Sequence, residues 1–315
     1  MKKNRLKKSN ITFVIFTYNE EKRIAYPIKC YLPYGDVLIS DDSSIDNTVK
    51  IAEKLGARVI KRGHHGASFV ETKAESDFVL SHVKTDWVFW GFADEMVPKT
   101  CLNIYKKIAQ ENKYKVVVQK RKTLMYDGES EFFPAIGSVE IKFYKKGSMD
   151  YSNNTIHQSG RFAHHVRPQE ILYLSPLDEY SVYHFSPFTT ETQIKTISSY
   201  YLAHAKTLAN NISNLKIVFN PLFLFFTVYI LQGAWMRGIK GFIVAMQSMF
   251  YTYMISTKAW ELKNDITWDS MEKKYRIAKE KMLISSPKSS IFRKVWAYII
   301  MLMVSRLHKW YKFRK

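Results

Sequence analysis

The chain has 315 residues, 46% hydrophobic and 24% charged, a composition that excludes disordered and fibrous proteins. Its 48 basic residues outnumber its 28 acidic residues, which gives a net charge of +20. Residues 1–10 contribute +5 and residues 264–315 contribute +9, so the two ends carry most of the excess. This distribution disfavours a compact nucleic-acid-binding domain and favours ends that contact an anionic membrane surface.

Only two cysteines, Cys30 and Cys101, are present, which excludes a disulfide scaffold and indicates a reducing cytoplasm. The first apolar run, residues 11–16, is too short for a signal peptide. Residues 217–231 come closest to the length of a membrane span, but Asn220 and Pro221 lie near their start. A single-pass protein is therefore less favoured than a peripheral one.

The first 120 residues alternate between strand and helix patterns. Short apolar runs predict strands at residues 11–16, 36–40, 58–60, 87–92 and 116–120. Helical patterns fall between them at residues 20–30, 45–55, 69–81 and 99–110, with Ser44 as the predicted N-cap of the second helix. This alternation predicts an α/β fold, a mostly parallel sheet with helices on both faces.

Polar clusters follow three of these strands: residues 17–20, Asp41-Asp42 and Asp94-Glu95. Ligands of such sheets bind beyond the carboxyl ends of the strands. Neighbouring carboxylates repel one another, and a divalent cation that bridges to phosphates is the simplest compensation. The alternative is that each residue only serves a turn or a helix cap.

Together, residues 16–21 (FTYNEE), 41–48 (DDSSIDNT) and 93–95 (ADE) resemble the family 2 glycosyltransferases of the GT-A fold. The likeness is greatest to the branch that contains lipopolysaccharide-core β-1,4-glucosyltransferases, and it covers roughly residues 10–262. It implies a Rossmann-like GT-A catalytic domain at residues 11–188 and a nucleotide-sugar donor, with a UDP-sugar favoured. It also implies an inverting transfer to a glycan or glycolipid acceptor, in lipopolysaccharide or other cell-envelope biosynthesis.

The resemblance also implies roles for single residues. Thr17 and Glu20 would line the nucleoside pocket, and Asp41 would hydrogen-bond the base. Asp94 would coordinate Mg²⁺ or Mn²⁺ on the diphosphate, where a cation offsets the negative charge that develops on the leaving group. The further donor-binding positions that it implies are Tyr18, Asp42, Asp77 and Ala93.

Two positions depart from the family pattern. Phe92 replaces the first aspartate of a D-A-D turn, and the family's His-Glu pair reads His157-Gln158. Direct attack by an acceptor hydroxyl needs a general base. His157 is the first candidate because its ordinary pKa lies near neutral, and Asp150 is the second. A hydrogen-bonded loop histidine is the alternative for His157. The departures also motivate a second function, a non-catalytic nucleotide-sugar or glycan-binding protein that keeps the fold.

The remaining histidines suggest a metal site less well. His64-His65, His164-His165 and His184 could in principle bind zinc, but adjacent histidines point in different directions and no cysteine lies nearby. Residues 63–66 (GHHG) are instead expected to form a loop that closes over the donor. The chain has no Gly-rich phosphate loop of the kind that a nucleotidyltransferase would need.

The carboxyl-terminal third predicts helices at a membrane surface. In the helical region 189–263, residues 233–257 carry a bulky apolar face opposite Arg237 and Lys240, which favours a position in the bilayer interface over docking on the catalytic domain. The tail, residues 264–315, holds a charged helix at 270–283 and a basic aromatic helix at 291–313. With the basic arm at residues 1–10, these patterns predict a peripheral protein on the cytoplasmic face, and the aromatic face disfavours nucleic acid as the tail's partner.

Overall fold

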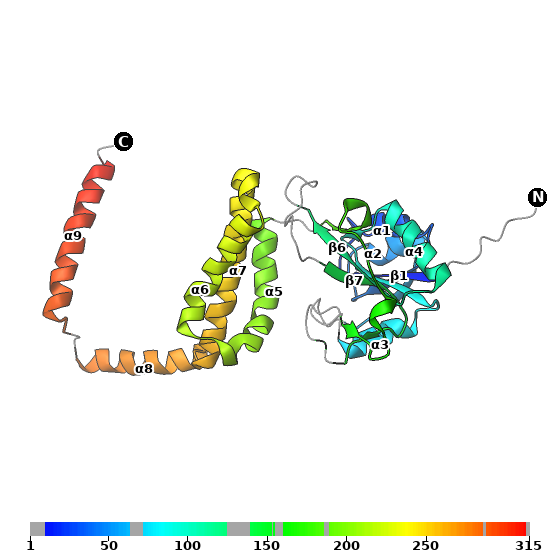
Figure 1. The fold of residues 1–315 in the computed structure, drawn as a ribbon. Helices are drawn as coiled ribbons and strands as arrows, with labels where there is room; N and C mark the ends of the chain where they lie inside the picture. The colour runs from blue at the N-terminus through cyan, green and yellow to red at the C-terminus, as the bar shows by residue number, and fades with distance from the viewer. Residues whose placement is uncertain are drawn as a thin grey trace, which may run out of the picture. The chain divides into compact units, whose positions relative to one another are not determined.

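The computed structural model describes residues 10–63, 72–124, 139–152, 154, 160–185, 189–285 and 288–312. The chain divides at Glu261 into two compact units, which are described separately. The first unit holds an α/β domain and then a helical segment (Figure 1). The helices of the α/β domain are α1 Ala25–Tyr31, α2 Thr48–Lys54, α3 Lys73–Ser81 and α4 Lys99–Glu111. Its strands are β1 Ile11–Thr17, β2 Asp36–Asp41, β3 Arg58–Lys61, β4 Trp87–Phe92, β5 Glu95–Met96, β6 Val116–Thr123, β7 Val139–Lys145, β8 Met149–Asp150, β9 Arg161–Phe162, β10 Ile171–Tyr173 and β11 Val182–His184.

Nine of these strands form one sheet in the order β3-β2-β1-β4-β7-β6-β11-β5, with β10 also paired to β6. Strands β3, β2, β1 and β4 are all parallel. Strand β7 runs antiparallel to both β4 and β6, and β5 runs antiparallel to β11. The predicted α/β class with a mostly parallel sheet is confirmed. The antiparallel insertion of β7 was not predicted.

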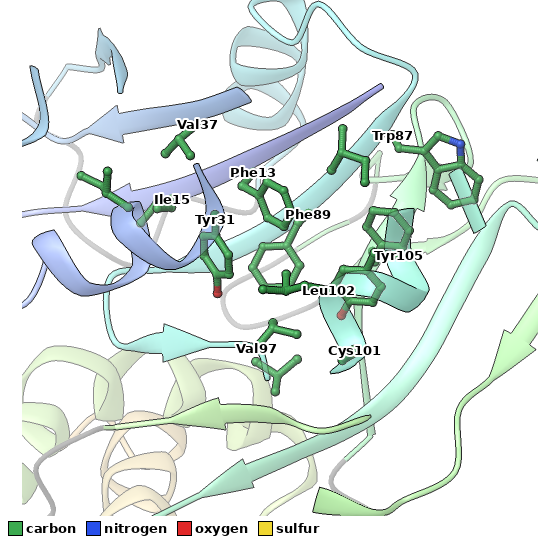
Figure 2. Packing of buried hydrophobic residues seen from close by; sticks show 14 of the residues in the cluster. Phe13, Ile15, Tyr31, Val37, Trp87, Phe89, Val97, Cys101, Leu102 and Tyr105 are labelled. Carbon is green, nitrogen blue, oxygen red and sulfur yellow. The ribbon is translucent and has the colours of Figure 1, made fainter. Parts of the chain in front are cut away.

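Both faces of the sheet are buried, as expected for parallel strands with covering helices. Successive β1 residues alternate between two apolar clusters: Phe13 and Ile15 lie in one, Val14 and Phe16 in the other. Helices α1, α2 and α4 contribute to the first cluster and α3 to the second. The centre of the first cluster is aromatic (Figure 2), with the rings of Phe13 and Tyr31 stacked at 4.6 Å. Burying large rings of this kind is the main apolar stabilisation of a sheet core.

Three helices begin later than predicted, among them α3, which begins at Lys73 rather than at residue 69 with Thr72 as its N-cap. Helix α1 begins at Ala25 rather than at residue 20, and α2 begins at Thr48 rather than at residue 45. Ser44 is not the N-cap of α2, because Asn47 holds that position and the Ser44 side chain donates to Asp41 instead. Tertiary hydrogen bonds therefore keep both loops out of the helices.

The helical segment holds α5 Thr190–Leu208, α6 Asn214–Phe226 and α7 Gly238–Lys263. A π-helical turn, η5 Thr227–Leu231, continues α6, and a short 3-10 helix, η6 Ala234–Arg237, precedes α7. The α6–α7 hairpin, residues 214–263, has a small core in which Phe225 and Tyr229 contact the Phe242 ring. The 18 residues of Asn214–Leu231 are long and apolar enough to cross a membrane, with a mean hydropathy of 1.6 and 11% of them buried.

The second unit holds two helices, α8 Trp268–Ile284 and α9 Ile291–Lys312. Helix α8 has no buried residue, and residues 291–304 of α9 are all exposed. The described side chains of these helices form no buried core within this unit.

Candidate active site at the carboxyl ends of the strands

Three neighbouring strands end at one edge of the sheet. In the β1–β2 ladder Thr17 lies opposite Asp41, and in the β1–β4 ladder Phe16 lies opposite Phe92. Because all three strands are parallel, the loops that follow them emerge at the same level. The register therefore brings the Thr17, Asp41 and Asp94 regions to a common rim.

Asp41 is fully buried and already well bonded. Its Oδ1 accepts hydrogen bonds from Thr17 Oγ1 at 3.2 Å and from Ser44 Oγ at 2.5 Å, and its Oδ2 accepts one from the Ser44 backbone N–H at 2.9 Å. A buried carboxylate needs such donors to offset its lost hydration. Asp41 thus shapes the turn after β2, and a direct contact with a nucleobase stays a prediction.

The loops after β1 and β2 are held together by reciprocal bonds. The Asn19 backbone N–H donates to Ser44 Oγ at 2.9 Å, and the Ile45 N–H donates back to Asn19 Oδ1 at 2.9 Å. One residue on, the Glu20 N–H donates to Thr48 Oγ1 at 2.7 Å. These bonds fix the position of Glu20 relative to the start of α2.

Asp94 is a partly buried carboxylate between an imidazole and a guanidinium. His184 Nε2 lies 3.3 Å from Asp94 Oδ2, and Arg23 Nη1 lies 3.7 Å from the same oxygen. Burial raises the pKa of Asp94, but the hydrogen bond and charge of His184, with the charges of Arg23 and Arg121, outweigh it and hold the pKa at about 2. Asp94 is therefore ionised at neutral pH.

Arg23 joins the two halves of the rim. Its guanidinium donates to both carboxylate oxygens of Glu20 at 2.6 Å, while Nη1 faces Asp94. Burial raises the pKa of Glu20, as do the charges of Asp94 and Asp46, against the opposing effect of Arg23. A bidentate pair of this kind holds its partners in a defined geometry. Through it, the Asp41 loop and Asp94 belong to one connected group.

A second set of buried charges lies directly behind Asp94. Glu95, which is fully buried, contacts Lys142 Nζ at 3.1 Å and Arg121 Nε at 3.2 Å. Both cations also contact Glu140, at 3.0 Å and 3.2 Å. The Lys142 ammonium lies 4.7 Å from the centroid of the Phe92 ring. Phe92, where the family has an aspartate, is thus accommodated by a cation–π contact.

Asp42 belongs to another buried ion pair on the same edge. Its Oδ1 lies 3.9 Å from Arg62 Nη2, while Arg62 Nη1 lies 3.5 Å from Glu75 Oε2. The Arg62 guanidinium also covers the Phe16 ring at 5.4 Å. Asp42 therefore connects the end of β2 to α3, and its predicted contact with the donor is untested.

The other predicted site residues lie in different surroundings. Asp77 is 61% exposed on α3 and pairs with Lys73 at 2.5 Å. Tyr18 is exposed, and Ala93 is buried beside Asp94. Asp150 lies on β8 of a separate two-stranded sheet. His157, like His64 and His65, falls outside the described residues.

Asp150 has the geometry of a turn residue. Its Oδ1 accepts hydrogen bonds from Ser152 Oγ at 2.6 Å and from the Ser152 N–H at 2.9 Å. These bonds lower the pKa of Asp150. A carboxylate with a lowered pKa is a weaker base, so the geometry disfavours Asp150 as the predicted base.

The roles of three site residues were not predicted from the sequence: Arg23, His184 and Lys142. Arg23 stands three residues after Glu20, a spacing that could have indicated their pairing. His184 was considered only as a zinc ligand, and its contact with Asp94 spans 90 positions, for which no local pattern exists. Lys142 lies on β7, the strand that was not predicted.

The chemistry of the rim fits a divalent cation that shares its ligands with a substrate. No cluster of three or more His, Cys, Asp or Glu side chains able to hold a metal occurs among the described residues. Asp94 and His184 offer one carboxylate and one imidazole on the same side of the rim. Mg²⁺ is commonly held by one or two carboxylates together with substrate phosphates and water, so Asp94 fits such an ion once a diphosphate is bound.

An apolar cavity of about 300 Å³ adjoins Asp94. It lies between α1, β5 and the residue that follows β11, and its accessible wall is almost entirely apolar. The residues that line it are Arg23, Tyr26, Pro27, Ala93, Asp94, Met96 and Phe185.

Comparison with known proteins agrees with the predicted family. Residues 12–164 match the family model described as "Glycosyl transferase family 2". An uncharacterised glycosyltransferase of Rickettsia conorii is 28% identical over 278 residues, which cover 84% of this chain and 95% of that protein. Another from Rickettsia felis is 27% identical, with 82% and 96% covered. Among solved structures, a mannosyltransferase from Pyrobaculum calidifontis in complex with GDP-mannose and Mn²⁺ has a TM-score of 0.48 at 14% identity, with 81% of this chain and 88% of that chain covered.

Proposed function

We propose that this chain, whose residues 12–164 match the family 2 glycosyltransferase model, is a metal-dependent, inverting glycosyltransferase that acts at a membrane surface. Its donor is a nucleoside diphosphate sugar, with a UDP-sugar favoured. Its acceptor is a lipid-linked, lipopolysaccharide or other cell-surface glycan. The observation that carries the proposal is the bridge Glu20–Arg23–Asp94, which connects the loops after β1 and β4 at one rim, while Asn19 bonds the loop after β2.

In this proposal different rim residues hold different parts of the donor. The loops at Thr17–Glu20 and Asp41–Ser44 form the wall for the nucleoside, since their reciprocal bonds fix the backbone there. Asp94, with His184 beside it, would hold the divalent cation, which would supply positive charge to offset the charge developing on the leaving diphosphate. Arg23 keeps Asp94 and Glu20 in position.

The proposed identity of the general base rests on the sequence, because His157 lies outside the described residues. His157 is proposed as the group that takes the proton of the acceptor hydroxyl, because its ordinary pKa suits that task. The turn geometry and lowered pKa of Asp150 support His157 indirectly. In the alternative of a non-catalytic binder, the same rim would bind a nucleotide-sugar without turnover.

The membrane part of the proposal rests on the α6–α7 hairpin. Its surface is apolar on several sides: Phe223 of α6 is 71% exposed and Ile239 of α7 is 70% exposed. Basic side chains flank these surfaces, with Lys216 at the start of α6 and Arg237 and Lys240 near the start of α7. Apolar faces bordered by basic residues are typical of helices at the bilayer interface.

Helix α5 favours an interfacial hairpin over a membrane-spanning one. Tyr251 Oη of α7 lies 3.2 Å from His204 Nδ1 of α5, so a polar helix lies against one side of the hairpin. A helix that carries Glu191, Lys195 and Lys206 would be costly to place in hydrocarbon. We propose that α5 faces water and that the opposite side of the hairpin enters the cytoplasmic leaflet.

Donor binding provides the direct test of the proposed activity. In calorimetry of the full chain with UDP, we expect binding in the presence of Mn²⁺ that weakens at least tenfold when the metal is chelated. Incubation with UDP-sugars should release UDP slowly, because water can replace a missing acceptor. Metal-independent binding without release of UDP would support the non-catalytic alternative, and no binding of UDP or GDP would contradict both.

The basic tail makes a separate prediction about location. Deleting residues 285–315 should release the protein from vesicles that contain anionic lipid, since residues 288–315 carry eight basic residues and no acid. Each well-placed charge contributes about 1 kcal/mol. The measurement is flotation with phosphatidylcholine vesicles, with and without phosphatidylglycerol. A second variant, which replaces Lys288, Arg293 and Lys294 by glutamine in the full chain, should also float less. Flotation that is unchanged in both variants would remove the tail from this role.

A further inference from the structure

The cavity beside Asp94 has a wall that does not suit any part of a nucleotide-sugar. Nucleoside, diphosphate and sugar all carry polar groups that need hydrogen bonds when water is removed. The accessible wall here is made by the side chains of Tyr26, Pro27, Met96 and Phe185 with almost no polar surface. A cavity of about 300 Å³ is at the lower end of the range for small-molecule sites, and such sites are mostly apolar.

One polar atom at this cavity is nevertheless left without a hydrogen bond. Arg23 Nη1 is buried and has no hydrogen-bond partner within the described part of the chain, although it lies 3.7 Å from Asp94 Oδ2. A buried N–H of this kind is costly unless a ligand oxygen accepts from it. The cavity thus combines an apolar wall with two charged lining residues, Arg23 and Asp94, which face each other.

Taken with the proposed transferase function, on which this inference rests, we propose that the cavity is a subsite for the acceptor. It binds the hydrocarbon next to the acceptor's reacting end, and that end lies beside Arg23 and Asp94. The acceptor class that fits is an amphiphile, in which the apolar segment begins within a few atoms of the oxygen that receives the sugar. A purely polar oligosaccharide would leave this apolar wall exposed to water.

The position of the aromatic walls supports an entry from solvent. Tyr26 is 65% exposed and Phe185 is 43% exposed, although both line the cavity. Exposed aromatic rings that flank a cavity provide apolar contact area at low entropic cost. A chain segment can therefore reach the cavity past Tyr26 and Phe185, whereas the lining residues Pro27 and Ala93 are buried.

Photo-crosslinking with a dodecanol that carries a diazirine tests the subsite on the full chain. We expect labelled residues, mapped by mass spectrometry, within the segments 23–27, 93–96 or 183–185. Tyr26→Asn and Phe185→Asn should each reduce labelling of these segments at least fivefold. The matched controls, Tyr173→Asn and Leu177→Asn, change residues that are 68% and 51% exposed and do not line the cavity, and they should leave labelling unchanged.

Two results would overturn the subsite. One is labelling confined to the α6–α7 hairpin and α9, and the other is equal labelling of the three segments in all four variants. Far-UV circular dichroism shows whether each variant is folded. UDP binding, measured on the same samples, separates the two proposals: its absence in wild type would contradict the transferase function, whereas its presence without cavity labelling would contradict the acceptor subsite alone.

Discussion

Replacing Asp94 by alanine should reduce sugar transfer by about a thousandfold or more, the usual consequence of removing a group that stabilises charge in a transition state. The variant loses the carboxylate proposed to hold the cation and leaves His184 and Arg23 without their shared partner. The measurement is the rate of UDP release from a UDP-sugar. Asp178→Ala is the control, because Asp178 is a 58% exposed carboxylate that also pairs with a single cation, Lys122.

The pH dependence of the unfolding free energy tests the same variant independently of its activity. The folded pKa of Asp94, about 2, lies below its ordinary value of 3.8, so the carboxylate stabilises the fold above pH 4. That contribution, about 2 kcal/mol, is lost as the pH falls from 4 to 2. Asp94→Ala should therefore show a smaller loss of unfolding free energy over this interval. Full activity in a folded Asp94→Ala protein would contradict the site assignment.

Replacing Lys142 by alanine should lower the free energy of unfolding by about 3–5 kcal/mol, because it leaves Glu95 buried with too little compensation. Burial lowers the pKa of Lys142, but the charges of Glu95 and Glu140 outweigh it, so the pKa is raised and the ammonium stays protonated at neutral pH. The removal also uncovers the Phe92 ring. Urea denaturation followed by circular dichroism measures the loss.

Lys145 offers a control for this prediction on the same strand. Its Nζ donates to Asn112 Oδ1 at an exposed position, and Lys145→Ala should change stability by less than about 0.5 kcal/mol. The double variant Glu95→Gln/Lys142→Met should recover part of the loss, since it removes the uncompensated charge. Equal stability of the two single lysine variants would show that the Glu95 contacts contribute little.

Local sequence was sufficient for the elements of the parallel half-sheet. Strands β1, β2, β3 and β4 begin at the predicted residues, because short runs of β-forming side chains that are buried on both faces have few other stable arrangements. The antiparallel β7 was missed. Its sequence, VEIKFYK, places Lys142 at a buried position, and only the carboxylates of Glu95 and Glu140 make that position tolerable.

The first residues of α1 and α2 could not be predicted from local sequence alone. Ser44 has the chemistry of an N-cap, but its hydroxyl donates to Asp41 and accepts from the Asn19 backbone N–H. These partners come from two different strand ends, and their bonds outweigh the local preference for an earlier helix. Helix boundaries at this rim depend on which strands are neighbours, which a single loop does not encode.

By itself, the sequence determined the α/β class and the positions of the polar loops after β1, β2 and β4, since each depends on runs of a few adjacent residues. Only the tertiary structure decided that Arg23 connects Glu20 to Asp94, that His184 lies on Asp94, and that Lys142 lies under Phe92. The Asp94 contacts join residues 71 and 90 positions apart. Such pairs form because burial removes the water that would otherwise solvate each charge, and the nearest opposite charge then replaces it.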